Sequence, residues 1–527
     1  MPVVGVGHEE PLEWQFELGH QGLERRNVPL LNPDHQPIGI NRHRNVGGLI
    51  RATADHRFQL RGLQPSSRSD SVWRLGITGK RVPVIRGRHP TREYNRNHDT
   101  FDDRQPPEAH PRPVSKPNPL TVDVRYGRSG RLALSVDADR LVTRREAPEQ
   151  LETLDSSIRA ALTTPLDFPP LEQAVIPGDR IVIALDADTP AADRILAAIW
   201  DVLALRDVEP DDVLVLQPRS SHPGAPADPR SALTRNVASR ISWQIHDPDE
   251  AEGGQYLATS SSGERVYLAA ELIEADLVIP VGPVGFDSVL GYRGTHSVLY
   301  PGLSNAESIT RALGGGHREL EPADQRPLRQ LVDDVGWLLG VQFCVQVVPA
   351  TGSGVAGVWA GCPESVFQAA RECLEDAWRV ELAERPDIVI ASIEADAGGH
   401  GWNQVGRALA VARNLVAHEG RILLLTDLKE PPGDGLKLVR SADAPSEALS
   451  PLKSLAPADL VPATQCVEAA DWARIYLMSR LDSDLVEDLF ITPLEHPDEI
   501  SRLLELPGQC VIIENAQHAY GRIQSGE

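Results

Sequence analysis

The stretch Arg180-Ile-Val-Ile-Ala-Leu185, followed at once by Asp186-Ala-Asp-Thr-Pro190, decides the fold class. Its unbroken apolar run is typical of a strand that is covered on both faces, as in a parallel sheet. The segment 190–205 that follows places Ile195 and Ile199 on one helical face. A buried strand followed by an amphipathic helix predicts an α/β unit.

The same alternation continues along the chain. We expect a hairpin over 120–136, further buried strands, and a helix over 404–418. Strands are expected at 213–216, 277–281, 387–392, 421–426 and 510–513, and 241–245 has a patterned, strand-like sequence. The pattern predicts an α/β protein with two α/β domains, mostly parallel sheets and an interdomain cleft, preceded by an irregular N-terminal arm. The predicted domains are 119–325 and 326–527.

Residues 1–118 differ in composition from the rest. They hold 18 basic and 13 acidic residues and eight of the 16 histidines, whereas the whole chain has a formal charge of −23. They have no sustained helical or strand periodicity. Three interpretations stay open: a disordered extension, a start placed too far upstream, and a basic arm that contacts nucleic acid or an acidic partner.

Composition excludes several classes of protein. The acidic charge of −23 argues against nucleic-acid binding, which needs a basic surface. The sequence has no apolar run of about 18 residues and no signal-peptide pattern, so we expect a cytoplasmic protein without a membrane partner. The five cysteines are scattered and are expected to be reduced. The expected partner is a small-molecule substrate, and the oligomeric state stays open.

Two glycine-rich segments are candidates for ligand-binding loops. Gly352-Ser-Gly-Val-Ala-Gly357 matches the dinucleotide pattern GxGxxG, but the text after it is strand-like, so a hairpin turn is the better interpretation. The segment 291–302, Gly-Tyr-Arg-Gly-Thr-His-Ser-Val-Leu-Tyr-Pro-Gly, follows a predicted strand. Its Arg293, His296 and Ser297 could meet an anionic ligand, although a purely structural loop is equally consistent with these residue types.

From about Leu120 onward the chain resembles the nickel-dependent lactate racemase family, as a divergent member. Segment 291–302 is similar to the family's GYSGGAKSILPG. Other motifs that resemble the family occur in the same order along the chain. They are Leu185-Asp-Ala-Asp-Thr-Pro190, Ser220-Ser-His-Pro223, Ile245-His-Asp247, Ala275-Asp-Leu-Val-Ile279, Pro386-Asp-Ile-Val-Ile-Ala-Ser392 and Trp402-Asn-Gln-Val-Gly-Arg407.

The resemblance implies a racemase or epimerase that acts on a small 2-hydroxy acid or a related hydroxy compound. The family binds a nickel pincer nucleotide, which accepts hydride from the substrate while two histidines transfer the hydroxyl proton. By position, the implied catalytic residues are His222 and Asp287, the latter in place of the second histidine. The implied substrate-binding residues are Asp186, Arg293, Gln404 and Arg407.

The cofactor positions depart from the family pattern. Ser297, beside His296, stands at the covalent lysine, and Leu313 stands at the nickel histidine, with His317 one helical turn later as a candidate metal ligand. Thr189 replaces a substrate-binding arginine. The resemblance therefore leaves open an active isomerase, a non-catalytic or regulatory binding paralogue without the nickel pincer, and a different hydro-lyase or isomerase chemistry on the same scaffold.

Overall fold

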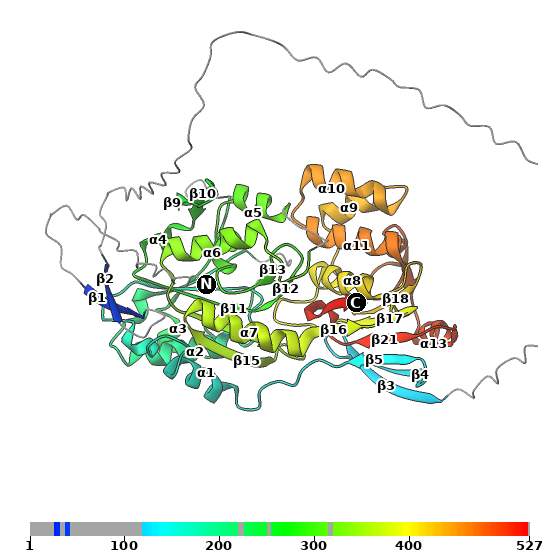
Figure 1. Ribbon diagram of the computed structural model, residues 1–527, viewed down its shortest axis with the longest axis horizontal. Helices are drawn as coiled ribbons and strands as arrows, with labels where there is room; N and C mark the ends of the chain where they lie inside the picture. The colour runs from blue at the N-terminus through cyan, green and yellow to red at the C-terminus, as the bar shows by residue number, and fades with distance from the viewer. Residues whose placement is uncertain are drawn as a thin grey trace, which may run out of the picture. The chain divides into compact units, whose positions relative to one another are not determined.

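The computed structural model describes residues 118–219, 226–249, 254–314 and 320–524. Outside these ranges it describes only two paired strands, β1 (Arg26–Leu31) and β2 (Pro37–Arg42). Apart from these strands, the expectations for residues 1–118 lie outside the described residues. Figure 1 shows the elements of residues 118–524, which form two lobes, each around one sheet.

The first lobe surrounds a six-stranded sheet. Its strand order is β15-β14-β11-β6-β7-β8, and every neighbouring pair is parallel except β14 and β15. In that order the strands are Val355–Gly361, Cys344–Pro349, Leu277–Pro283, Ile181–Leu185, Val213–Gln217 and Ser242–Ile245. The predicted hairpin at Gly352 is confirmed, since β14 and β15 pair antiparallel across it.

Helices cover both faces of this sheet. Ile181 and Ile183 of β6 pack on one side with α1 and α2, while Val182 and Ala184 pack on the other side with α6. This two-sided burial is why β6 is apolar throughout. The helices of this lobe are α1 (Leu154–Thr163), α2 (Ala192–Ala204), α3 (Arg235–Ala238), α4 (Ala270–Glu274), α5 (Ala306–Leu313) and α6 (Pro327–Leu339). Shorter elements are η1 (Leu171–Gln173), η2 (Pro210–Asp212), β9 (Gln255–Thr259), β10 (Arg265–Leu268), β12 (Gly285–Asp287), β13 (Gly291–Arg293) and η3 (Val298–Gly302).

The second lobe surrounds a fully parallel sheet. Its order is β20-β19-β18-β17-β21-β5. In that order the strands are Thr492–Leu494, Arg474–Met478, Arg421–Leu425, Ile388–Ser392, Cys510–Ile513 and Leu141–Arg145. The helices are α8 (Trp402–Leu415), α9 (Asp434–Arg440), α10 (Leu449–Leu455), α11 (Leu460–Trp472), α12 (Ser483–Glu487) and α13 (Pro497–Glu505), with η4 (Pro445–Ala448) and η5 (Ala516–His518).

The two faces of this sheet are covered differently. Val389 and Ile422 pack with α8 and α11, whereas Ile390 and Leu423 pack with α13 and with the hairpin β3–β4. The hairpin consists of β3 (Pro119–Tyr126) and β4 (Gly130–Asp137), as predicted. At the edge of the lobe, β16 (Arg379–Leu382) pairs with β22 (Tyr520–Ile523).

Each of the two sheets contains strands from both sides of the predicted domain boundary at residue 325. β5 lies early in the chain but belongs to the second lobe, and β14 and β15 lie late in the chain but belong to the first. α7 (Pro363–Trp378) bridges the lobes, because it packs on β14 and β15 and adds Trp378 to the second core. The boundary itself stays a prediction.

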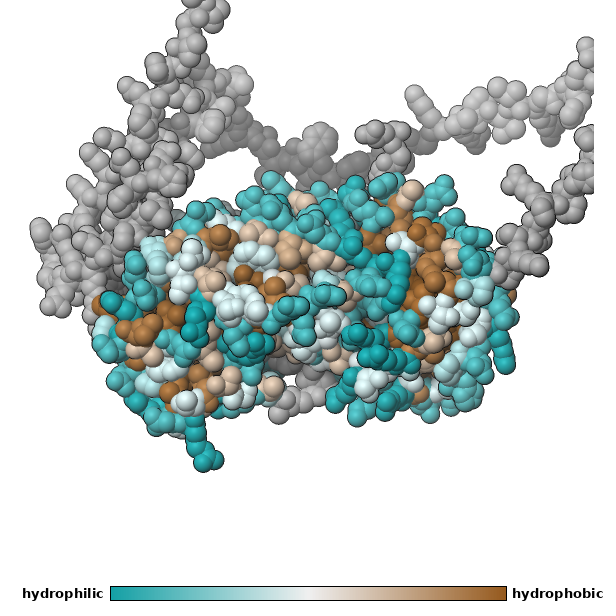
Figure 2. Space-filling view, turned by 90° about the horizontal axis from the view of Figure 1, so that it is seen from below, coloured by the Kyte–Doolittle hydropathy of each residue, from teal (hydrophilic) through white to brown (hydrophobic). Residues whose placement is uncertain are grey.

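Hydrophobic residues form separate patches among hydrophilic ones on the face shown in Figure 2. Within the described ranges, no helix is long and apolar enough to cross a membrane. All five cysteines are free thiols.

Because of the exchanged strands, fragments cut at residue 325 are expected not to fold alone. A fragment 119–325 lacks β14 and so exposes the edge of β11, and a fragment 326–527 lacks β5. Circular dichroism during heating should give a cooperative transition for 118–524 and none for either fragment. A cooperative transition in a fragment would contradict the expectation.

Candidate functional site

Acidic loops of the two lobes meet where strands of both sheets end. Asp186 and Asp188 follow β6, and Asp396 follows β17. The lobes touch here, since a Cβ on Gly398 would lie 2.7 Å from Oδ1 of Asp188. Ligands of α/β proteins bind at the carboxyl ends of parallel strands, so this junction is the candidate site.

Asp186 shapes the first of these loops. Its backbone N–H donates to the carbonyl of Val281 at 2.8 Å, and its Oδ1 accepts from the N–H of Asp188 at 2.9 Å. Burial raises the pKa of Asp186, against the opposing influence of Arg293. Gly282 leaves the space for it, because a Cβ there would stand 2.9 Å from the Asp186 Cβ.

Asp188 contacts two arginines. Its Oδ2 lies 2.6 Å from Nη1 of Arg293 and 3.8 Å from Nη2 of Arg407. Arg293 belongs to β13 of the first lobe, and Arg407 to α8 of the second. Burial would lower the pKa of Arg293, but Asp188 and Asp186 outweigh it and raise that pKa, so Arg293 stays charged. The predicted substrate-binding residues Arg293 and Arg407 are thus brought together with Asp186.

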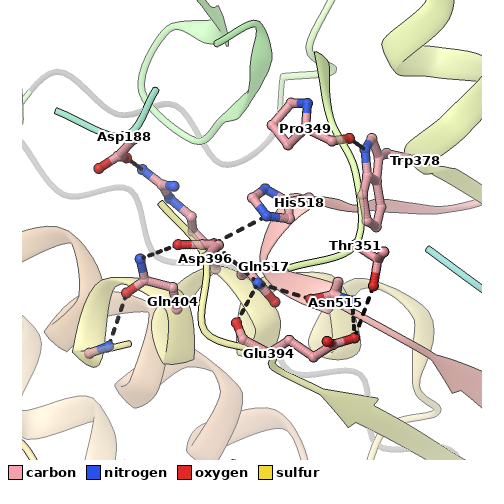
Figure 3. Close-up of polar contacts among 12 residues, drawn as sticks. Asp188, Pro349, Thr351, Trp378, Glu394, Asp396, Gln404, Asn515, Gln517 and His518 are labelled. Carbon is pink, nitrogen blue, oxygen red and sulfur yellow. Dashed lines mark hydrogen bonds and ion pairs between the residues drawn. The ribbon is translucent and has the colours of Figure 1, made fainter. Parts of the chain in front are cut away.

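Asp396 organises the second-lobe side of the site, as Figure 3 shows. Its carboxylate accepts from Nε2 of Gln517 at 3.2 Å and from Nε2 of Gln404 at 3.5 Å, and lies 3.1 Å from Nε2 of His518. Gln404 is buried, and its Oε1 accepts from the N–H of Gly401 at 3.1 Å. Gln404 therefore fixes the start of α8, which positions Arg407 one turn later.

A second histidine–carboxylate pair lies nearby. Nε2 of His400 is 2.6 Å from Oγ1 of Thr426 and 2.9 Å from Oδ1 of Asp427. Burial lowers the pKa of His400, although Asp427 and Asp396 act in the opposite direction. His400 borders a cleft of about 780 Å³ that also contains Thr189.

The other main cavity is a pocket of about 490 Å³ lined by both lobes. Its four cationic residues outnumber its two acidic ones, Asp287 and Glu468. The cations are Arg326, Arg407, Arg413 and Lys453. Apolar side chains such as Phe286 complete the wall. A positive pocket in a chain of charge −23 is suited to an organic anion.

The remaining predicted residues are placed as follows. Asp287 borders the pocket, but its Oδ1 accepts from the N–H groups of Val289 and Leu290, each at 2.8 Å, and so closes the β12–β13 turn. His296 points toward α6, 3.7 Å from Asp333. His222 and His317 lie outside the described residues.

Two residues that the resemblance assigns to the cofactor, Ser297 and Leu313, do not offer the groups that hold a nickel pincer in the family. Oγ of Ser297 accepts from the N–H of Gly294 at 2.8 Å, which closes the loop, and a serine cannot form the lysine linkage. Leu313 packs against the second core. Among the described residues, no three His, Cys, Asp or Glu side chains group to hold a metal.

Fold and candidate site define a class: a two-lobed α/β protein with two mostly parallel sheets and a polar junction between them. Residues 126–314 match the lactate racemase N-terminal domain family. Members of this family use a nickel pincer cofactor. No curated protein sequence matches the chain.

Two solved structures are similar to this fold. The lactate racemase apoprotein from Thermoanaerobacterium thermosaccharolyticum aligns with a TM-score of 0.64 and 16% identity, over 77% of this chain and all of that one. A protein from Thermotoga maritima aligns with a TM-score of 0.56 and 11% identity, over 70% of this chain and 98% of that one. At these identities the likeness shows the α/β fold.

Sequence reasoning did not select Asp188, Asp396, His400, Asp427 or His518. All five follow buried strands of the two sheets within about ten residues. Their common signal is an acidic or histidine residue in a loop at a strand's carboxyl end. That signal was available for Asp396 and Asp427 after strands 387–392 and 421–426.

The buried His400 gives a testable pKa. We expect it to titrate below its ordinary value of 6.5, and Asp427→Asn should lower the pKa further by removing a carboxylate that raises it. Because the folded pKa is depressed, His400 supports stability above pH 6.5, and this is lost as the pH falls through the folded pKa. NMR titration of the imidazole measures both effects. A value above 6.5, or a rise in the variant, would contradict the assignment.

Proposed function

We propose that this protein binds a small organic anion, of the 2-hydroxy acid class, in the pocket between its lobes, without a nickel pincer. The observation that carries the proposal is the 490 Å³ pocket in which cationic side chains outnumber acidic ones. Its walls combine apolar surface with a few polar groups, which is typical of small-molecule sites. Arg407 is the carboxylate-binding residue, since its planar guanidinium suits a carboxylate.

The hydroxyl of such a ligand needs partners of its own. Gln465 and Gln517 line the same pocket as Arg407, and each carries an amide that can donate and accept hydrogen bonds. Gln517 is already held by Asp396 at 3.2 Å, so its position is fixed before the ligand arrives. A fixed amide beside a guanidinium favours a hydroxy acid over a simple carboxylate.

A second candidate function is an epimerase of small 2-hydroxy acids that relies on proton transfer. It is favoured by two buried histidine–carboxylate pairs near the site, His400 with Asp427 and His518 with Asp396. An imidazole oriented by a carboxylate is a common acid–base arrangement. The α-hydrogen of a hydroxy acid is weakly acidic, however, and Ser297 and Leu313 leave the family's hydride acceptor without its protein attachments.

Ligand binding can be measured directly. Calorimetric titration with L-lactate and D-lactate should give saturable binding, and Arg407→Ala should weaken it at least about tenfold, the effect of losing a charged hydrogen-bond partner. Arg159→Ala is the control, because Arg159 lies on α1 and its side chain is 70% exposed. Equal affinity in the two variants would show that Arg407 does not bind the ligand. A lack of binding by the wild type would refute the proposal.

The absence of the pincer is a separate prediction. Protein produced in cells that make the pincer nucleotide should contain no stoichiometric nickel, show no added mass, and fail to interconvert the lactate enantiomers. Metal analysis, intact mass and a chiral assay test these points. Stoichiometric nickel with the added mass of the cofactor would overturn this part of the proposal.

A further inference from the structure

The carboxylate of Asp188 already lies between two cationic side chains. Its Oδ2 lies between Arg293 at 2.6 Å and Arg407 at 3.8 Å, and these two side chains come from different lobes. A single carboxylate between two guanidinium groups is the arrangement that an anion-binding site presents to a bound ligand. Here the anion belongs to the protein itself.

The loop that carries Asp188 is held in place. Its N–H donates to Oδ1 of Asp186 at 2.9 Å, and Oγ1 of Thr189 donates to the carbonyl of Asp186 at 2.6 Å. On the opposite side, Gly398 of the second lobe leaves no room for a Cβ beside the Asp188 carboxylate. The side chain is therefore directed into the junction by contacts from both lobes.

The two arginines differ in how firmly they hold Asp188. Arg293 is close, its side chain is 12% exposed, and it borders the small cavity beside Asp188 but not the 490 Å³ pocket. Arg407 is more distant, its side chain is 28% exposed, and it borders both that cavity and the 490 Å³ pocket. Arg407 is thus the cation that faces both Asp188 and the space for a ligand.

We propose that Asp188 acts as an internal anion, and that the carboxylate of a ligand binds by taking Arg407 from it. This inference rests on the proposed function and adds a mechanism of regulation to the same site. The exchange replaces one carboxylate partner of Arg407 by another, so no charge is left buried without a partner, while Asp188 keeps Arg293. An uncharged ligand of the same shape gains nothing from the exchange.

The internal anion should weaken the affinity for anions. Each ligand that binds through Arg407 must compete with Asp188, so the intrinsic affinity is reduced by the fraction of molecules in which Arg407 is available. It should also link the lobes, because Asp188 and Arg407 lie on opposite sides of the cleft. Removing the charge of Asp188 is therefore expected to strengthen ligand binding, the reverse of what loss of a direct ligand contact would do.

The test is calorimetric titration of L-lactate into the full-length wild type and Asp188→Asn at one ionic strength. We expect the variant to bind about tenfold more tightly, in line with removal of an internal competitor. Asp193→Asn is the matched control: it removes the same charge five residues away, and Asp193 contacts Ser231 rather than either arginine. The added substitution Arg407→Ala should abolish the gain.

The outcomes separate the two proposals. Equal or weaker binding by Asp188→Asn, with the wild type binding, would overturn the internal anion and leave the proposed function standing. No binding by either protein would overturn both. If Asp188→Asn fails to melt cooperatively, Asp188→Thr, which also removes the charge, is titrated instead and is judged by the same criteria.

Discussion

The ion pair of Asp188 with Arg293 and Arg407 is the interaction on which the rest of the site depends. It joins the loop after β6, the hairpin β12–β13 and the helix α8, and so connects both sheets at their carboxyl ends. Exposed ion pairs contribute little to stability, but these groups are mostly shielded from solvent, and a partly buried cation needs a partner. The elements that form the cleft therefore also bring together the charges that neutralise one another there.

Several residues at which the sequence departs from the pattern of the similar family have structural roles in this protein. Ser297 closes a loop through Gly294, and Leu313 packs against the second core beside the pocket. The carboxylate of Asp287 likewise accepts hydrogen bonds from the backbone of a turn. What remains polar and directed at the cleft is a different set of residues, centred on Asp188, Asp396 and Arg407.

Much of the fold could be predicted from the sequence, because apolar runs such as 181–185 report burial on both faces of a sheet. The hairpin over 120–136 and the turn at Gly352 were predictable for similar reasons, since alternation and glycine are local signals. The membership of β5 and β14 was not, because the partner of a strand depends on contacts far along the chain. For the site, the family resemblance pointed to Asp186 and Arg407, but no local pattern indicates that Asp188 contacts a residue more than 200 positions away.

The exchange of strands between the lobes has a mechanical consequence. The described chain passes from one lobe to the other between β5 and α1 and again at the end of α7, and these passages are adjacent, since Arg145 donates to the carbonyl of Asp376. Two neighbouring covalent connections restrict relative rotation more than one flexible linker does. A relative rotation of the lobes would therefore pivot about these two adjacent connections, which limits how far Asp188 and Arg407 could be displaced sideways from each other.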